Sequence, residues 1–378
     1  MASTTKKLGV GVLGAHTWAE KAHLPGYAAD PRVDLVAICD VVPERAQAMA
    51  KMFGARRVYG TAAELLADRE IAMVDVCTPT DTHLELGLAA IAAGKHVLCE
   101  KPIARDAADA FRLARAAAAA KVKTKVGFTF RYSPALRQIK SWIADRTLGE
   151  IFHIHGLEQN SQFLDPHFPL RQVPAGVDFN AKHPIPQSIV GYGSHLVDLM
   201  RWLAGDFAAV AATMRNYVPA RIVRGYEGLQ RINVYDGTVA LVEFTSGAQG
   251  MLQTSIVAVG NYPGIEIRVY GSKGAAVGRL VTERGIAETL HRARAEAVEF
   301  EPVTLPASHF PPGTSLQTEW RELYYRNLVR LWVGELIEGR VSEGDFLDGA
   351  KSQEIVDACV RAHVERRWVD LPRYSDAS

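Results

Sequence analysis

The first third of the chain repeats one pattern, an apolar strand followed by a helix, and this repeat constrains the fold more than any other feature. The helical segments between the strands are long enough for right-handed crossovers, which place successive strands parallel. We therefore expect a doubly wound parallel sheet in an α/β domain that covers residues 1–130. The expected strands are residues 8–13, 33–38, 58–59, 73–77, 96–99 and 124–130.

The pattern changes after residue 130. Strand-like runs follow one another at hairpin spacing, with turn signals such as Ser246-Gly247 between them. This spacing predicts a second α/β domain over residues 131–378, with a mostly antiparallel sheet. The segment 165–186 is rich in Pro, Phe, His and Asp, and we interpret it as a long irregular loop, a kind of loop that is often functional. Helices are expected at 134–144, 194–203, 319–338 and 345–365, and strands at 151–157, 237–244, 250–257 and 264–270.

Composition excludes several classes of function. The 378 residues include 43 basic and 42 acidic side chains, and a net charge of +1 gives no electrostatic case for binding nucleic acid or an anionic membrane. No apolar run is long enough to span a bilayer, and the amino terminus lacks a signal-peptide pattern. Because none of the four cysteines forms a CxxC pair, we expect neither a metal site nor disulfides, and we expect a cytoplasmic protein.

A glycine turn after the first strand predicts a nucleotide site. The run Gly9–Gly14 matches G-x-G-x-x-G as text, but Gly9 and Gly11 lie inside the strand, whereas the fingerprint belongs at the strand-to-helix turn. We therefore begin the motif at Gly14, with His16 in its second position and Ala19 in its third. The amino terminus of the next helix offers N–H groups to a phosphate. A turn without a ligand is the alternative. The residues expected to contact the cofactor here are Gly14, His16, Thr17 and Trp18.

Asp40 ends the second strand, where an acidic side chain can accept hydrogen bonds from the adenosine ribose. Its charge repels a 2′-phosphate, which favours NAD, whereas Arg45 in the next helix keeps NADP possible. The alternative is that Asp40 caps the helix at Pro43. The segment that leaves the fourth strand is expected to line the cofactor further along. The remaining expected contacts are Thr78, Pro79, His83, Glu100 and Lys101.

The triplet Glu100-Lys101-Pro102 ends the fifth strand, which places a lysine at the carboxyl edge of the sheet. Ligands bind at this edge in open α/β sheets. A lysine beside an apolar pocket can have its pKa lowered enough to exchange protons near neutral pH. On its own the triplet is also typical of a solvated turn, so its weight comes from the motifs around it.

Taken in order, these motifs resemble the Gfo/Idh/MocA oxidoreductase family, which includes glucose-fructose oxidoreductase and inositol dehydrogenase. The resemblance covers nearly the whole chain and implies a Rossmann domain followed by an α/β domain with a large open sheet. That sheet often forms a dimer interface, so a homodimer or homotetramer is expected. The motifs are the Gly14 turn, His23-Leu-Pro25, Asp40, Thr78-Pro79 with His83, 93–96, Glu100-Lys-Pro102, 127–134, 148–151, 193–198, 201–205 and 271–274.

The resemblance implies reversible oxidation of a sugar or polyol hydroxyl, with hydride passing to a nicotinamide. Lys101 and His195 would share proton transfer and polarisation of the hydroxyl oxygen. Imidazole suits this role because it titrates near working pH. Taken alone, His195 is better explained as a cap of the helix that begins near it. Arg131 and Tyr132 could contact substrate or nicotinamide, or they could serve an ion pair and packing at the domain interface.

One departure from the family pattern leaves a second hypothesis open. Many dehydrogenases of this family carry an aspartate four residues before the histidine, and here that position is Gly191. Tyr192, Asp178 or His183 could compensate, and we include Tyr192 and Asp178 among the expected substrate contacts. The alternative is a dinucleotide-binding regulator or scaffold of the same fold that lacks turnover.

Overall fold

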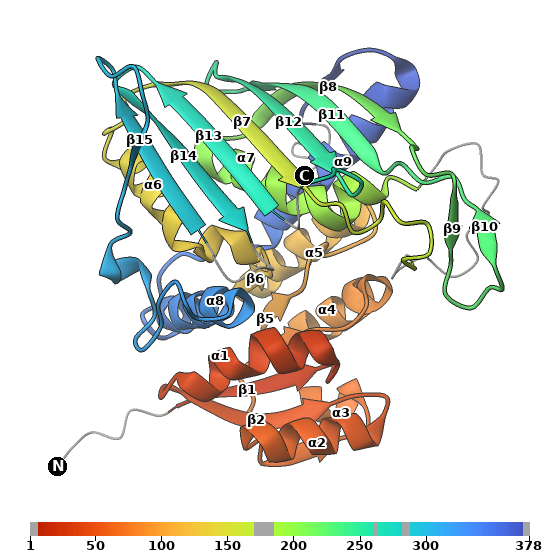
Figure 1. Cartoon of the computed structure of the whole chain (residues 1–378). Helices are drawn as coiled ribbons and strands as arrows, with labels where there is room; N and C mark the ends of the chain where they lie inside the picture. The colour runs from red at the N-terminus through yellow and green to blue at the C-terminus, as the bar shows by residue number, and fades with distance from the viewer. Residues whose placement is uncertain (1–6, 170–184, 261–263, 282–287, 373–378) are drawn as a thin grey trace. The chain divides into compact units, whose positions relative to one another are not determined.

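The computed structural model describes residues 7–169, 185–260, 264–281 and 288–372 (Figure 1). The chain forms two compact units. The first is built from Met1–Ser133 and Phe310–Gln353, and the second from Pro134–His309 and Glu354–Ser378. Residues 310–353 thus belong to the N-terminal unit. The predicted single boundary at residue 130 placed them in the second domain. The roles assigned to the two domains stay a prediction.

The first unit contains the expected parallel sheet. Its six strands run in the order β3-β2-β1-β4-β5-β6, which is the Rossmann order, and all neighbouring pairs are parallel. The central strands are buried along almost their whole length, as expected for a sheet covered on both faces. The strands are β1 (Leu8–Leu13), β2 (Val33–Cys39), β3 (Arg57–Tyr59), β4 (Met73–Val76), β5 (His96–Cys99) and β6 (Thr124–Val126).

Local sequence signals set the ends of the helices between these strands. Pro43 occupies the first turn of α2, and Gly54 ends the helix in the left-handed conformation. Thr61 and Glu64 form a capping box at α3. Asp106 caps α5 by accepting a hydrogen bond from the Asp109 N–H. The elements are η1 (Ala19–His23), α1 (Leu24–Ala29), α2 (Pro43–Phe53), α3 (Ala62–Ala67), η2 (Thr80–Thr82), α4 (His83–Ala92) and α5 (Ala107–Ala120).

The sixth strand is shorter than predicted. We expected it over residues 124–130, but β6 ends at Val126 and a 3-10 helix, η3 (Thr129–Tyr132), follows. The reason is local, because the Phe128 and Thr129 N–H groups donate to the carbonyls of Val126 and Gly127 instead of to a neighbouring strand. Apolar residues therefore continue past the strand in a buried turn. The helix α8 (Trp320–Ile337) also belongs to this unit, as does the start of α9 (Phe346–Glu365).

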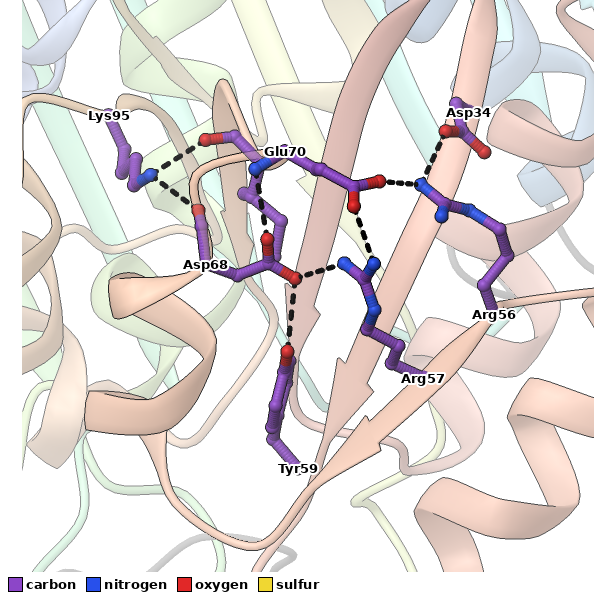
Figure 2. A network of polar contacts seen from close by, with 8 residues as sticks. Asp34, Arg56, Arg57, Tyr59, Asp68, Glu70 and Lys95 are labelled. Atoms are coloured by element: carbon purple, nitrogen blue, oxygen red, sulfur yellow. Dashed lines mark hydrogen bonds and ion pairs between the residues drawn. The ribbon is translucent and has the colours of Figure 1, made fainter.

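An exposed network of ion pairs joins the amino-terminal ends of several strands (Figure 2). Arg56 bridges Asp34 and Glu70, with nitrogen–oxygen distances of 2.8 and 2.5 Å. Arg57 bridges Asp68 and Glu70 in the same way, at 2.6 and 2.5 Å. Exposed pairs of this kind contribute little to stability. They lie at the edge of the sheet opposite to the one where ligands bind. Tyr59 and Lys95 complete the labelled network, the latter through main-chain carbonyls.

The second unit contains a nine-stranded sheet in the order β16-β15-β14-β13-β7-β12-β11-β8-β17. Its pairs are antiparallel except for β7 and β12, which run parallel. The sheet is therefore mixed, and the mostly antiparallel sheet is confirmed. The strands at 207–215, 274–281 and 288–294 were not predicted. The strands are β7 (Ile151–Gln159), β8 (Phe207–Arg215), β11 (Gly237–Phe244), β12 (Gln249–Ser255), β13 (Gly264–Gly271), β14 (Gly274–Val281), β15 (Glu288–Arg294), β16 (Glu301–Pro302) and β17 (Val369–Asp370), with β9 (Ala220–Ile222) and β10 (Leu229–Arg231) in a separate hairpin.

Two helices, α6 (Pro134–Ala144) and α7 (Ser194–Ala204), pack on one face of this sheet (Figure 1). Gly156 on β7 allows α7 to approach, because a Cβ there would lie 2.7 Å from Leu196 Cδ1 and 2.8 Å from Met200 Sδ. On β11 buried and exposed residues alternate, so the opposite face exposes apolar side chains such as Leu241. Among the described residues, no helix is long and apolar enough to cross a membrane.

Candidate active site

The glycine turn begins at Gly14, as the sequence predicted. Gly14 has φ +98°, and a Cβ there would lie 2.8 Å from the Cys77 carbonyl carbon and closer still to its oxygen. No other residue type fits this position without displacing backbone. Gly9 and Gly11 lie inside β1, where their missing side chains admit Glu70 and Ile71. His16 and Thr17 are exposed at the turn and Trp18 is half-buried, so this turn can approach a phosphate group.

Asp40 faces this turn. Its Oδ2 accepts a hydrogen bond from the Ala15 N–H at 2.7 Å, and its Oδ1 accepts one from the Val42 N–H at 2.8 Å. The residue that caps α2 is Val42, which makes no side-chain cap, so the capping role considered for Asp40 is not observed. Arg45 has an exposed side chain, and its Nη1 lies 3.8 Å from Asp40 Oδ1. The carboxylate is thus fixed beside the glycine turn, where a ribose contact is expected.

His83 braces two loops at the carboxyl edge of the sheet. Its Nε2 lies 2.8 Å from the Thr78 carbonyl oxygen, and its Nδ1 lies 2.8 Å from the Pro102 carbonyl oxygen. The ring is 1% exposed, so both nitrogens are committed to the protein. Thr78 also accepts a hydrogen bond from the Thr82 hydroxyl at 2.7 Å, and Pro79 is exposed beside it. Contacts of these residues with the cofactor stay a prediction.

The side chain of Glu100, the residue before Lys101, belongs to a buried network of polar contacts. Its Oε1 lies 3.1 Å from His23 Nε2 and accepts a hydrogen bond from the Tyr325 hydroxyl, and its Oε2 accepts one from the Lys101 N–H at 3.2 Å. On the far side of the ring, His23 Nδ1 lies 2.7 Å from Asp75 Oδ2. A single imidazole therefore separates two buried carboxylates.

The protonation states in this network follow from its contacts. Burial opposes a charge on the His23 ring, but the Asp75 carboxylate next to it holds the pKa of His23 well above its ordinary value. Burial also opposes a charge on Glu100, yet the hydrogen bond and positive charge of His23, with smaller contributions from Tyr325 and Lys101, lower the pKa of Glu100. Burial and the Glu100 charge raise the pKa of Tyr325, so this phenol stays protonated and donates. The network holds an imidazolium between two carboxylates.

Arg131 and Tyr132 lie in η3 and are buried. Arg131 Nη1 pairs with Asp348 Oδ2 at 3.1 Å, and the Tyr132 carbonyl accepts a hydrogen bond from the Asn327 side chain at 2.9 Å. These contacts fit the ion pair and packing that we gave as the alternative, although here the partners belong to the same compact unit. A contact of either residue with substrate stays a prediction.

His195 is the second residue of α7 and is 8% exposed. A π-helical turn, η4 (Ser188–Gly193), leads directly into this helix, and the cap residue is Gly193 without a side-chain cap bond. His195 is therefore not a helix cap, which removes the alternative explanation. Gly191 lies in the π-helical turn, with Gln187 Nε2 2.8 Å from where its Cβ would stand.

Tyr192 packs in a small apolar cluster, with its ring 6.1 Å from that of Phe163. Asp178 and His183 are the two other residues that we expected could compensate for the missing aspartate. Both lie outside the described residues. Only Tyr192 can therefore be placed, and it lies on the turn that carries Gly191.

Sequence reasoning missed three members of the buried network: Asp75, Tyr325 and Tyr27, whose hydroxyl donates to Asp75 Oδ2 at 2.8 Å. One signal was available. Asp75 is an acidic residue inside a fully buried strand of a parallel sheet, and a charge there requires a partner. His23 appeared in the sequence only as part of a motif, without a role.

Comparison with known proteins agrees with this geometry. Residues 8–128 match the model of the oxidoreductase family with an NAD-binding Rossmann fold, and residues 136–277 match the GFO/IDH/MocA C-terminal domain. Fold and matches define an NAD-dependent oxidoreductase. The chain belongs to the Gfo/Idh/MocA family.

Individual relatives cover nearly the whole length of the chain. Levoglucosan dehydrogenase of Pseudarthrobacter phenanthrenivorans is 27% identical over 410 aligned residues, 98% of this chain and 100% of that protein. Inositol 2-dehydrogenase of Rhizobium meliloti is 27% identical, covering 96% of this chain and 98% of that protein. The structure of a levoglucosan dehydrogenase in complex with NADH and levoglucosan superposes with a TM-score of 0.83 at 26% identity, over 97% of this chain and 100% of the other.

Proposed function

We propose that this protein is an NAD-dependent dehydrogenase that interconverts a hydroxyl and a ketone on a sugar, a sugar derivative or a cyclic polyol. The observation that carries the proposal is the position of Lys101, two residues after the end of β5 at the carboxyl edge of an NAD-binding Rossmann sheet. The substrate class rests on relatives that are named dehydrogenases of levoglucosan and inositol.

The residues at the glycine turn fit a dinucleotide. The turn at Gly14 leaves no room for a side chain, His16 and Thr17 after it are exposed, and Asp40 is fixed beside it. Gly14, His16 and Thr17 would hold the phosphates, and Asp40 the adenosine ribose. NAD supplies a hydride acceptor when bound. The exposed Arg45, 3.8 Å from Asp40, leaves NADP as a second cofactor to test.

Lys101 and His195 are the proposed proton-transfer groups. In the direction of oxidation, the hydroxyl proton must leave as its carbon loses a hydride, and a lysine with a suitable pKa can accept it. His195 would polarise the same oxygen or share the proton. Because Gly191 replaces the family aspartate, the Tyr192 hydroxyl on the same turn is our candidate for the missing polar group.

The test measures NADH formation with NAD⁺ across monosaccharides, anhydrosugars, inositols and glycosides, repeated with NADP⁺. Wild type should turn over at least one of these, and Lys101→Ala should lose at least about a hundredfold in kcat. Lys7→Ala is the matched control because Lys7 precedes β1 and is exposed. Full activity of Lys101→Ala on an identified substrate contradicts the proposal.

A second function is favoured by one observation. Gly191 removes a carboxylate that many family dehydrogenases use, and a chain without it could bind a dinucleotide as a regulator without catalysis. This hypothesis predicts tight NAD binding in calorimetry and no hydride transfer across the whole panel. Turnover of any sugar or polyol excludes it.

We also propose that two copies of the chain associate through the open face of the nine-stranded sheet. This face exposes Val239 and Leu241 on β11, which are 41% and 56% exposed. Neighbouring apolar side chains on an open sheet favour a protein partner over water. Sedimentation of Leu241→Lys should yield a smaller species than wild type.

All four cysteines are buried free thiols, which supports the predicted cytoplasmic location.

A further inference from the structure

Behind Lys101 lies a buried charge cluster whose members touch one another in an unbroken series. Asp75 contacts one ring nitrogen of His23, and Glu100 contacts the other. Glu100 also accepts a hydrogen bond from the Lys101 main-chain N–H. His23 and Asp75 are 0% exposed and Glu100 is 8% exposed. The residues come from β4, from η1 and from the end of β5, so three separate elements meet at this point.

With both neighbouring carboxyl groups ionised, the geometry assigns a positive charge to His23. Each ring nitrogen lies within 3.1 Å of a carboxylate oxygen, and a carboxylate accepts but does not donate. A neutral imidazole has only one N–H, so it would leave one nitrogen lone pair against a carboxylate. An imidazolium donates to both.

Glu100 is held in a single orientation. Its Oε1 is shared by His23 and the Tyr325 hydroxyl, its Oε2 receives the Lys101 N–H, and Gly127 lies against its carboxyl group. Tyr325 is itself fixed, because its oxygen accepts a hydrogen bond from Trp18 Nε1 at 3.0 Å. The carboxylate can therefore neither rotate nor move away from Lys101.

We propose that Glu100 sets the charge and orientation of Lys101, and that His23 is the buried cation that keeps Glu100 ionised. Both are positioning residues, and the role rests on the proposed proton transfer by Lys101. Asp75 and Tyr27 fix His23 from the other side. Two carboxylates and one imidazolium leave one net negative charge behind the lysine, which favours its ammonium form.

The groups that face this cluster all allow its negative charge to raise the pKa of Lys101. His23 faces Asp75, Glu100, Cys77 and Tyr325, while Lys101 is one of the charges that lower the pKa of Glu100. Burial holds the pKa of Cys77 and of Tyr325 above their ordinary values, so both stay neutral. Within this cluster, Asp75 and Glu100 supply the negative charge next to Lys101.

The experiment titrates Lys101 directly and needs no substrate. Lysines are ¹³C-methylated, the resonance that is missing in Lys101→Arg is assigned to Lys101, and its shift is followed over pH. Glu100→Gln should lower the pKa of Lys101 by about one unit, because an adjacent opposite charge is lost. His23→Gln should lower it in the same direction, because without the cation the buried Glu100 takes up a proton and the negative charge adjacent to Lys101 is lost. The double variant should shift it no further.

The matched control is Glu70→Gln, which makes the same exchange in the exposed network at the amino edge and should leave Lys101 unchanged. Circular dichroism confirms that each variant is folded. An unchanged Lys101 titration in folded Glu100→Gln or His23→Gln overturns the proposal. If either variant fails to fold, ¹⁵N spectra of wild-type histidines decide. His23 should show two protonated ring nitrogens at pH 8, and a single protonated nitrogen overturns it.

Turnover then separates this proposal from the proposed function. On a substrate that is oxidised, the ascending limb of the kcat profile should move to lower pH by about one unit in both variants. A loss of packing alone would lower kcat without moving the limb, and that result overturns the positioning role. Silence of wild type on every substrate refutes the dehydrogenase and leaves the titration of Lys101 as the separate measure of the cluster.

Discussion

Gly127→Ala tests whether Glu100 is as tightly held as its contacts indicate. A Cβ at residue 127 would lie 2.9 Å from the Glu100 carboxyl carbon, closer still to Oε1, and 3.3 Å from the Glu100 Cα. Ordinary contact begins at 3.4 Å, so the carboxyl carbon must retreat by at least about 0.5 Å and Oε1 by more. Gly127 does not have a positive φ, so backbone strain does not contribute.

The magnitude follows from what Glu100 must give up. Overpacking of a dense interior costs about 1–3 kcal/mol, and a lost hydrogen bond between charged groups costs about 1.5–3 kcal/mol. We expect Gly127→Ala to lower the free energy of unfolding by about 3 kcal/mol. The same displacement should lower kcat, because the Lys101 main chain is bonded to Glu100.

Urea unfolding followed by circular dichroism measures this difference. Gly60→Ala is the matched control, because the only neighbour within 4 Å of its Cβ would be Glu64 Oε2 at 3.8 Å. In a Glu100→Ala background the conflict with the carboxyl group disappears, so Gly127→Ala should cost much less there. If Gly127→Ala is as stable as Gly60→Ala, Glu100 can move freely and the reasoning is wrong.

Three other predictions concern the cofactor, pH and the amino edge. Asp40→Ser should weaken NAD binding about tenfold in calorimetry, because a hydrogen bond to the ribose is lost. It should also reduce the preference for NAD over NADP, because the charge that repels the 2′-phosphate is removed. His23 has a folded pKa above its unfolded value, so its contribution is complete below about pH 6.5 and declines as pH rises toward the folded pKa. In urea unfolding, the free energy of unfolding of the wild type should therefore fall by about 1.4 kcal/mol per pH unit above about pH 6.5, and a flat wild-type profile there contradicts a buried imidazolium. Arg57→Ala should change the urea midpoint little at high salt, because the Arg57 and Glu70 side chains are 35% and 50% exposed and Asp68 keeps its hydrogen bond from Tyr59; a large loss there would contradict the minor role of this network.

The N-terminal fold could be predicted because each local signal agrees with the global pattern. Pro43 begins α2, Gly54 ends it, and apolar runs too short for helices alternate with the helices. The sheet of the second unit was harder. The parallel pair β7–β12 joins residues 96 positions apart, and no local signal encodes such a pairing. Strand β14, Gly274–Val281, is rich in Gly and Ala and lacks the alternation that indicates a strand.

The candidate site divides in the same way. Gly14 and Lys101 follow strand ends, so their placement depends only on the order of the strands. The contacts of His23 and Tyr325 depend on side chains from distant parts of the chain. Tyr325 reaches Glu100 across 225 residues of sequence, from a segment that we had assigned to the other domain. The sequence contained the signal that Asp75 needs a partner, but not which residue provides it.

The two edges of the Rossmann sheet carry ionic networks of opposite character, and the contrast bears on function. At the amino edge Arg56, Arg57 and Glu70 are largely exposed, and such pairs cost little to form (Figure 2). At the carboxyl edge Asp75, His23 and Glu100 are removed from water, which costs several kcal/mol for each ion before any attraction is counted. Apolar residues of similar volume in such a place are often as stable. Stability alone therefore gives no reason for this cluster at the edge that carries Lys101, whereas control of the charge on Lys101 does.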